Sequence, residues 1–305
     1  MTQQELRRAI VIYNPHSGAC RRRDRAADVA AFVAQLKAHG FVAQSWSTEG
    51  PGDGSALARR AVESGADVIV ASGGDGTLNE VLQGMVGSCV PLAIWPCGTA
   101  NVLARELKIS SDANAIARMV FDGKQRRVAI GRAVWSDGER FFFLMAGVGL
   151  DASIVRALHP VAKARWGEGA FWLAGLQHFV AWRPQAFWVQ LEERRYKSAF
   201  TVVGNAATYA GGFRITPRAR MDEALLDVCI YPLRSFAWQY SQNIVASWRG
   251  RRHGGVVYRK TESVKMEPLA QHRDNPPWVQ VDGELLAPLP MRFEIVPDAL
   301  TILIP

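Results

Sequence analysis

The first 130 residues alternate between short apolar runs and longer segments with helical spacing, and this alternation strongly constrains the fold. Runs such as RAIVIYNP, FVAQSWS, DVIVASGG and VPLAIWPCG end at Gly, Pro or Ser, as buried parallel strands typically do. Between them, residues 24–39, 55–64 and 78–85 predict helices. Strand, helix and strand in repetition predict an open parallel sheet with helices on its faces.

The pattern changes after about Gly131, where alternating and aromatic-rich runs begin. AFWVQLEE, SAFTVVGNA, LLDVCIYP and WVQVDGELL are examples, and such runs predict antiparallel strands joined by tight turns. A length of 305 residues also favours two domains at about 150 residues each. We therefore expect an α/β domain followed by a β-rich domain.

Charge and cysteine content narrow the class of protein. The net charge of +8 and the pI of about 9.6 favour anionic partners: nucleic acid, phosphorylated metabolites or acidic lipid. The four cysteines (Cys20, Cys89, Cys97 and Cys229) form no CxxC pair, which fits neither a disulfide framework nor a zinc site. No signal-peptide core is visible, and the most apolar stretch, residues 170–182, is too short to cross a bilayer. We expect a cytoplasmic protein.

Residues 72–80, SGGDGTLNE, are the most specific motif, because they follow a predicted strand and open a predicted helix. Closely spaced glycines let the backbone approach a bulky anion, and the free N–H groups of the helix attract phosphate. Asp75 adds a carboxylate, which suits a magnesium ion or an acceptor hydroxyl. The loop matches neither GxxxxGK[ST] nor GxGxxG. It predicts a phosphate site, against the alternative of an ordinary strand-to-helix turn.

Two further loops end neighbouring strands: NPHSG at residues 14–18 and PCGTAN at residues 96–101. Each offers a hydroxyl, an Asn side chain and a glycine, which suits a helix cap as well as a phosphate or ribose contact. Either loop taken singly favours a cap. Three such loops on βα units of one sheet predict a nucleotide cleft.

These motifs continue into the second half with GVGLDA at residues 147–152, VGNAATYAGGFRITPRARMDEALLDV at 203–228 and VQVDGE at 279–284. Their order and spacing resemble the catalytic region of the diacylglycerol kinase and sphingosine kinase family, in particular its soluble bacterial lipid kinases. The resemblance covers essentially the whole chain. GGDGT alone would also suit NAD kinases, whereas the later motifs would not.

The resemblance implies a nucleotide-binding α/β domain over residues 1–130, completed by a C-terminal strand at about 292–305. It implies a β-sandwich lipid-acceptor domain over residues 131–291, with the active site in the cleft between the two domains. For the nucleotide it implies a set of loop residues, to which Asn14 is added from the first loop. The set is Asn14, Thr48, Gly73, Gly74, Asp75, Gly76, Thr77, Thr99 and Asn101.

Asp282 and Glu284 match the family's DGE motif, in which the glutamate is the general base that takes the proton of the acceptor hydroxyl. Such a base is needed because an alcohol is a poor nucleophile while it keeps its proton. Asp-Gly between strands is also a common type I′ hairpin turn. Both readings hold together if the turn presents the carboxylate.

The chain departs from the family at two places. Val102 stands where the family usually has Asp, so any contact of that acid is absent. In the structural metal loop the family tends to read DDGLLD, whereas residues 222–227 read DEALLD. The resemblance then implies Glu223 with the carbonyl groups of Arg220 and Leu225 as metal ligands. The alternative is a surface turn that leads into a strand.

Basic and aromatic segments suggest contact with a membrane surface. Arg21–Arg23 with Arg25, and residues 249–253, are positive runs that suit anionic headgroups or solvated helix starts and loops. A helix with Phe171, Trp172 and Leu176 on one face suits an acyl-chain pocket, an interface or core packing. No nucleic-acid-binding module is present.

Taken together, these features predict an ATP- and Mg²⁺-dependent lipid kinase that phosphorylates diacylglycerol or a related lipid alcohol, with Glu284, Asp282 and Asp75 as catalytic residues. Two alternatives remain: a kinase of a soluble metabolite such as NAD, and a non-catalytic protein that binds nucleotide or lipid. We expect a lipid substrate, peripheral contact with an anionic membrane surface and no nucleic-acid partner. The sequence predicts no oligomeric state.

Overall fold

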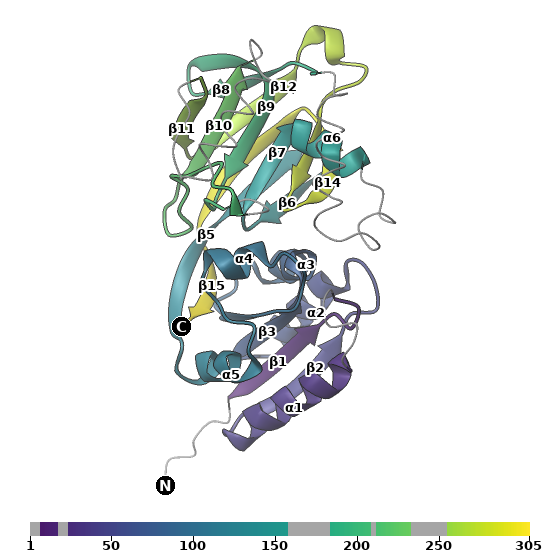
Figure 1. The fold of residues 1–305 in the computed structure, drawn as a ribbon, viewed down its shortest axis with the longest axis vertical. Helices are drawn as coiled ribbons and strands as arrows, with labels where there is room; N and C mark the ends of the chain where they lie inside the picture. The colour runs from purple at the N-terminus through teal and green to yellow at the C-terminus, as the bar shows by residue number, and fades with distance from the viewer. Residues whose placement is uncertain (1–6, 18–23, 158–183, 209–211, 233–254) are drawn as a thin grey trace. The chain divides into compact units, whose positions relative to one another are not determined.

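The computed structural model describes residues 7–17, 24–157, 184–208, 212–232 and 255–305 (Figure 1). The chain divides into two compact units, residues 1–128 with 298–305, and residues 129–297. Each unit is described by itself. The predicted helix around Phe171, the arginines 21–23 and the basic run at 249–253 lie outside the described residues. Within the described ranges, no helix is both long and apolar enough to span a bilayer.

The first unit contains the parallel sheet that the sequence predicts. Strands β1, β2, β3 and β4 pair in the order β4-β3-β1-β2, with all three interfaces parallel. Their bounds are Arg8–Tyr13, Val42–Ser47, Val68–Gly73 and Leu92–Pro96. The strand β15 (Met291–Ile304) joins the edge beyond β4, where Ile302 pairs with Leu92. β3 and β4 are buried along their whole length, which explains their continuous apolar runs.

Helices connect these strands and contact each other in pairs, α1 with α5 and α2 with α3 (Figure 1). They are α1 (Arg25–Ala38), α2 (Asp53–Glu63), α3 (Asp75–Met85), α4 (Val102–Glu106) and α5 (Ala113–Asp122). Carboxylates cap two of them, since Asp24 accepts from backbone N–H groups of α1 and Asp112 from one of α5. α3 begins three residues before the predicted Leu78, because extended Gly74 ends the loop and the helix starts directly at Asp75.

The order of the strands reverses beside β1. The chain passes from β1 to β2 on one side and then to β3 on the other. At such a switch point the connections from neighbouring strands leave in opposite directions, and a crevice opens beyond the carboxyl ends. The loops after β1 and β3 therefore flank the place where open α/β sheets bind ligands.

The second unit is built mainly of antiparallel pairs, and the predicted β-rich class is confirmed. Its elements are the part of β5 (Lys124–Trp135) from residue 129 on, β6 (Gly138–Phe142), β7 (Met145–Gly149), α6 (Leu150–Ala157), β8 (Phe187–Leu191), β9 (Arg194–Gly204), β10 (Leu226–Pro232), β11 (Val257–Thr261), β12 (Ser263–Pro268), a short 3-10 helix (Ala270–His272), β13 (Trp278–Val281), β14 (Glu284–Pro288) and the first half of β15, residues 291–297. Buried aromatic and aliphatic side chains, among them Phe142, Phe187 and Phe293, form its core. A Cβ at Gly131 would lie 2.2 Å from the Phe142 ring, so this position requires glycine.

Candidate functional site

The loops after β1 and β3 are joined by hydrogen bonds. The backbone N–H of Asn14 donates to the carbonyl of Ser72 at 3.0 Å, and Asn14 Nδ2 donates to Thr77 Oγ1 at 3.4 Å. Thr77 is buried in the first turn of α3. The two loops flank the reversal of strand order, so the predicted residues Asn14 and Thr77 lie together at the carboxyl ends of β1 and β3.

The glycine loop after β3 approaches the loop after β4 through bare backbone. A Cβ on Gly98 would lie 2.6 Å from the Cα of Gly74, and one on Gly73 would lie 2.5 Å from the Cβ of Thr77. The N–H of Cys97 also donates to the carbonyl of Gly73 at 2.8 Å. Gly98 is a glycine because a side chain there would separate the two loops, and Gly73 is one because a side chain would collide with Thr77.

Asp75 connects the same two loops through its carboxylate. Its two oxygens accept the backbone N–H groups of Val102 and Leu103 at 3.2 and 3.3 Å. These amides open α4, so the charge also lies at the positive end of that short helix. Each oxygen accepts one of these N–H groups, and a carboxylate has about four acceptor sites in all. Asp75 therefore holds the loops together and retains capacity for a cation.

The remaining predicted nucleotide residues lie at the same edge of the sheet. Thr48 is buried after β2, and its N–H donates to the carbonyl of Tyr13 at the end of β1. Asn101 adopts a left-handed conformation with φ of 46°, and its side chain both accepts from and donates to Gly98 at 2.8 Å. Thr99 is exposed in this loop, and Gly76 lies in the first turn of α3.

Glu80 connects two helices of this region, a role that the sequence does not predict. Its two carboxylate oxygens accept the backbone N–H groups of Gly52 and Gly54 at 2.9 and 3.0 Å. A Cβ on Gly54 would lie 2.8 Å from Glu80. Glu80, the last residue of the SGGDGTLNE motif, thus links α3 to the start of α2. The sequence marks the acid but not the loop that it reaches.

Arg25 differs from the sequence expectation. The sequence places it in a basic run expected to be solvated or to face a membrane, yet only 6% of its surface is exposed. The reason is local, because Asp24 starts α1 and the Arg25 side chain then lies over the Trp95 ring. Arg25 is therefore not part of an exposed basic surface.

In the second unit, Asp282 and Gly283 form the turn between β13 and β14. Both have positive φ, 46° and 84°, which is the conformation of a type I′ hairpin turn. The Asp282 carboxylate accepts the backbone N–H groups of Phe143, Leu144 and Met145 at 2.8 to 3.0 Å. Asp282 therefore fixes this turn to the connection between β6 and β7.

Glu284, the first residue of β14, forms an ion pair with Arg140 of β6. Glu284 Oε2 lies 2.8 Å from the Arg140 guanidinium, and the glutamate side chain is 42% exposed. The pair places a carboxylate in a defined direction at the surface of the second unit. Arg140 was not predicted, because nothing in its own neighbourhood of the sequence distinguishes it.

A buried polar network supports the same turn. The N–H of Gly283 donates to Gln280 Oε1 at 2.8 Å, and Gln280 Nε2 donates to Asp151 Oδ2 at 3.3 Å. Gln280 and Asp151 are almost fully buried. A Cβ on Gly147 would lie 2.4 Å from Asp151, which gives the GVGLDA motif a structural reason. The motif packs under the turn that presents Glu284.

The loop expected to hold a structural metal through Arg220, Glu223 and Leu225 is arranged differently. Glu223 Oε2 accepts from the Lys260 ammonium, and Glu223 Oε1 lies 3.4 Å from Arg220 Nε. Both oxygens of the only expected carboxylate ligand therefore face protein cations. In the described part of the chain, no group of three or more His, Cys, Asp or Glu is placed to hold a metal ion. Both Glu223 oxygens contact cations in this arrangement, and metal binding through Glu223 and the carbonyl groups of Arg220 and Leu225 stays a prediction.

Cysteine chemistry has no support in the described residues of the second unit. Cys229 is fully buried in β10, and burial, followed by the nearby Asp227 charge, strongly raises the pKa of its thiol. A thiol that stays protonated at neutral pH is a poor nucleophile. Cys229 is therefore a core residue.

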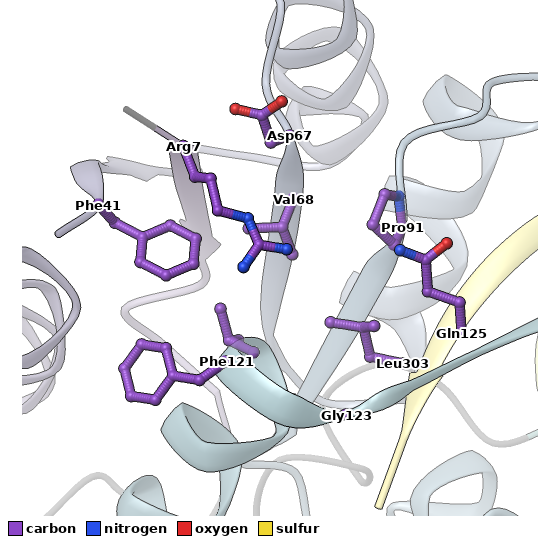
Figure 2. Close-up of a pocket in the computed structure, with 10 residues that line it drawn as sticks. Arg7, Phe41, Asp67, Val68, Pro91, Phe121, Gly123, Gln125 and Leu303 are labelled. Carbon is purple, nitrogen blue, oxygen red and sulfur yellow. The ribbon is translucent and has the colours of Figure 1, made fainter. Parts of the chain in front are cut away.

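A small hollow lies at the opposite edge of the parallel sheet (Figure 2). Arg7, Asp67 and Pro91, which surround it, immediately precede β1, β3 and β4. Its cavity volume of about 40 Å³ has room for only a few water molecules. Since ligands of open α/β sheets bind at the carboxyl ends of the strands, this hollow is not the nucleotide site.

Comparison with known proteins identifies the family. The diacylglycerol kinase catalytic domain family matches residues 8–133, and the YegS C-terminal NAD kinase beta sandwich-like domain family matches residues 145–304. The chain therefore belongs to the diacylglycerol kinase catalytic-domain family and carries a YegS-type C-terminal domain, which confirms the resemblance seen in the motifs. A kinase family implies the use of ATP.

The relatives span nearly the same length. A diacylglycerol kinase from Staphylococcus saprophyticus is 27% identical over 293 residues, which are 94% of this chain and 92% of the relative. One from Staphylococcus epidermidis is 26% identical and covers 94% and 89%. The crystal structure of a putative diacylglycerol kinase from Bacillus anthracis has a TM-score of 0.77 at 21% identity and covers 98% and 97% of the two chains. These likenesses confirm the fold class along the whole chain.

Proposed function

We propose that this protein is an ATP- and Mg²⁺-dependent lipid kinase that transfers the γ-phosphoryl group to a hydroxyl of diacylglycerol or a related lipid alcohol. The observation that carries the proposal is the joined set of loops at the reversal of strand order. There the backbone of Gly73, Gly74 and Gly98 is bare, and the N–H groups that open α3 are close by. Helix N-termini of this kind bind phosphate.

In the proposed complex, the glycine loop and Thr77 hold the phosphates of ATP, and Asn14, Thr48, Thr99 and Asn101 complete the nucleotide site. Asp75 is the carboxylate in this loop with capacity to contact Mg²⁺. Bound with ATP, the metal ion neutralises the phosphate oxygens and so favours attack by an oxygen nucleophile.

Glu284 is the proposed general base. Its carboxylate takes the proton of the acceptor hydroxyl while the hydroxyl oxygen forms a bond to the γ-phosphorus, and the bond from that phosphorus to the bridging oxygen of ADP breaks. Arg140 directs the Glu284 carboxylate, and Asp282 fixes the turn that precedes it. Both are positioning residues in this scheme.

The lipid acceptor is supported by the relatives, which are named diacylglycerol kinases. A lipid alcohol resides in a membrane, so we propose a cytoplasmic enzyme with peripheral contact at the anionic inner face of the membrane. The net charge of +8 favours such contact. The described residues identify no particular acyl chain.

Incubation with labelled ATP, Mg²⁺ and mixed micelles that each contain one lipid alcohol tests the proposal. The panel contains diacylglycerol, monoacylglycerol, a sphingoid base and an isoprenoid alcohol, with Glu284→Gln as the inactive control. We expect label in a lipid product, strongest for diacylglycerol or a close relative. Label in NAD without any lipid would identify a soluble-metabolite kinase instead. ATP binding without turnover on any alcohol would favour a non-catalytic binding protein.

A further inference from the structure

Arg25 is a buried cation without a carboxylate partner. Arg25 is the first residue of α1 and is 6% exposed. Its Nη2 donates to Ser72 Oγ, and its guanidinium lies 4.2 Å from the centroid of the Trp95 ring. The Nε atom has no hydrogen-bond partner. Among the described residues, none forms a salt bridge with Arg25. Charged side chains this buried are normally paired.

The position of Arg25 adds to this cost. The amino end of a helix carries partial positive charge, so a cation in the first turn of α1 is disfavoured. Stacking on Trp95 offsets part of the cost. Packing alone does not explain a charge here, because an uncharged side chain of similar length would cover the ring without it. The charge itself therefore calls for an anion.

The location identifies where that anion binds. Ser72 directly precedes Gly73 and Gly74, and its carbonyl accepts the N–H of Asn14. Arg25 thus contacts the residue that precedes the proposed phosphate-binding loop, next to the reversal of strand order. Ser17 follows Asn14 in the same region, is 8% exposed, and its Oγ also lacks a partner. A buried polar group without a partner needs an explanation, and here two such donors belong to the same set of loops.

We infer that Arg25 is a positioning residue for the nucleotide polyphosphate, with the Ser17 hydroxyl as a second donor in the same region. The inference rests on the proposed function and deepens it. Arg25 fixes Ser72 beneath the glycine loop and supplies a positive charge in a region of low dielectric, where a charge acts more strongly than in water. Its effect grows with the negative charge of the nucleotide.

The test measures dissociation constants of the full chain for ATP, ADP, AMP and adenosine by titration calorimetry. Arg25→Lys and Arg25→Gln form the matched pair, since both side chains are polar and only lysine keeps the charge. Arg60→Gln is the control, because Arg60 stacks on Trp46 at 4.9 Å in the same unit but is exposed. Ser17→Ala tests the second donor, and thermal unfolding checks the folding of each variant.

We expect Arg25→Gln to weaken ATP binding about tenfold, ADP binding less and adenosine binding hardly at all. Arg25→Lys should retain most of the ATP affinity, and Arg60→Gln should match the wild type. Equal losses for adenosine and ATP, or equal ATP affinity in folded Arg25→Lys and Arg25→Gln, would overturn the inference. A wild-type protein that binds no ATP would instead overturn the proposed function. If Arg25→Gln does not fold, Arg25→Lys still tests the inference. A folded Arg25→Lys variant that loses the preference for ATP over adenosine would contradict it, because lysine keeps the positive charge.

Discussion

Glu284 Oε2 lies 2.8 Å from the guanidinium of Arg140, and the two residues come from strands β14 and β6 of the second unit. An ion pair of this length fixes the direction of a carboxylate that is otherwise 42% exposed. In the proposed reaction the two residues have different roles, since Glu284 would accept the proton and Arg140 would orient its carboxylate.

Replacement of Glu284 by Gln should lower kcat by about 10²- to 10⁴-fold, because the acceptor hydroxyl loses its base. ATP affinity should stay within about twofold, since the residues proposed to bind the nucleotide lie in the first unit. Steady-state kinetics with a lipid acceptor and calorimetry with ATP measure the two quantities. Substantial turnover by this variant would remove Glu284 from the proposed role.

Replacement of Arg140 by Met should lower kcat about tenfold with an unchanged KM for ATP, because the carboxylate loses its orientation. Arg140→Lys should recover part of the rate. Arg195→Met is a suitable control, since Arg195 also pairs with a glutamate of this unit, Glu267, but at 3.8 Å and 50% exposed. An Arg140→Met variant with wild-type kcat would show that the pair does not serve catalysis.

Replacement of Gly98 by Ala should weaken ATP binding about tenfold or more, because its Cβ would lie 2.6 Å from the Cα of Gly74 and must separate the two loops. Gly50→Ala is the matched control, since a Cβ there meets nothing within 4 Å. Calorimetric titration with ATP compares the variants. Unchanged binding by Gly98→Ala would show that the contact between the loops is not needed for the nucleotide.

Replacement of Asp282 by Ala should destabilise the protein by about 2–4 kcal/mol, because three backbone N–H groups lose their acceptor. Urea unfolding measures the change in free energy. Asp274→Ala, at an exposed position, should alter it by less than about 0.5 kcal/mol. Equal stability of the two variants would mean that the turn does not depend on the Asp282 carboxylate.

Removal of divalent metal by a chelator should leave the free energy of unfolding of the nucleotide-free protein unchanged, since Lys260 and Arg220 already neutralise Glu223. Lys260→Met should cost about 1 kcal/mol, a small value because both side chains remain partly exposed. Lys265→Met, from the more exposed pair with Glu267, should cost less. Urea unfolding with EDTA and with Mg²⁺ measures these effects, and a clear loss of wild-type stability in EDTA would contradict the arrangement.

The fold and the loops could be predicted because their signals are local. Val and Ile runs, glycines beside a helix start, and an Asp-Gly pair between strands each specify backbone conformation within a few residues. The Asp282 turn is an example, since its residue types alone predict the observed positive φ values. The local pattern, however, predicts the start of α3 at Leu78, three residues after its observed start at Asp75.

Long-range partners could not be predicted in the same way. Glu284 and Arg140 are 144 residues apart, and Lys260 lies 37 residues beyond Glu223. Their pairing depends on strand register, which emerges only when the sheets form. Arg25 shows the same limit in another form. It ends the basic run that begins with Arg21–Arg23, and its burial depends on the packing of α1 against Trp95, which the run itself does not indicate.

The division of β15 between the two units has a consequence for synthesis. Residues 298–305 belong to the first unit together with residues 1–128, and Ile302 pairs with Leu92 at the edge of the parallel sheet. On the ribosome, the first unit therefore cannot be complete when its first 128 residues emerge. It must wait, with β4 as an open edge, until the intervening unit has been translated, and this interval is a point of exposure to aggregation and to chaperones.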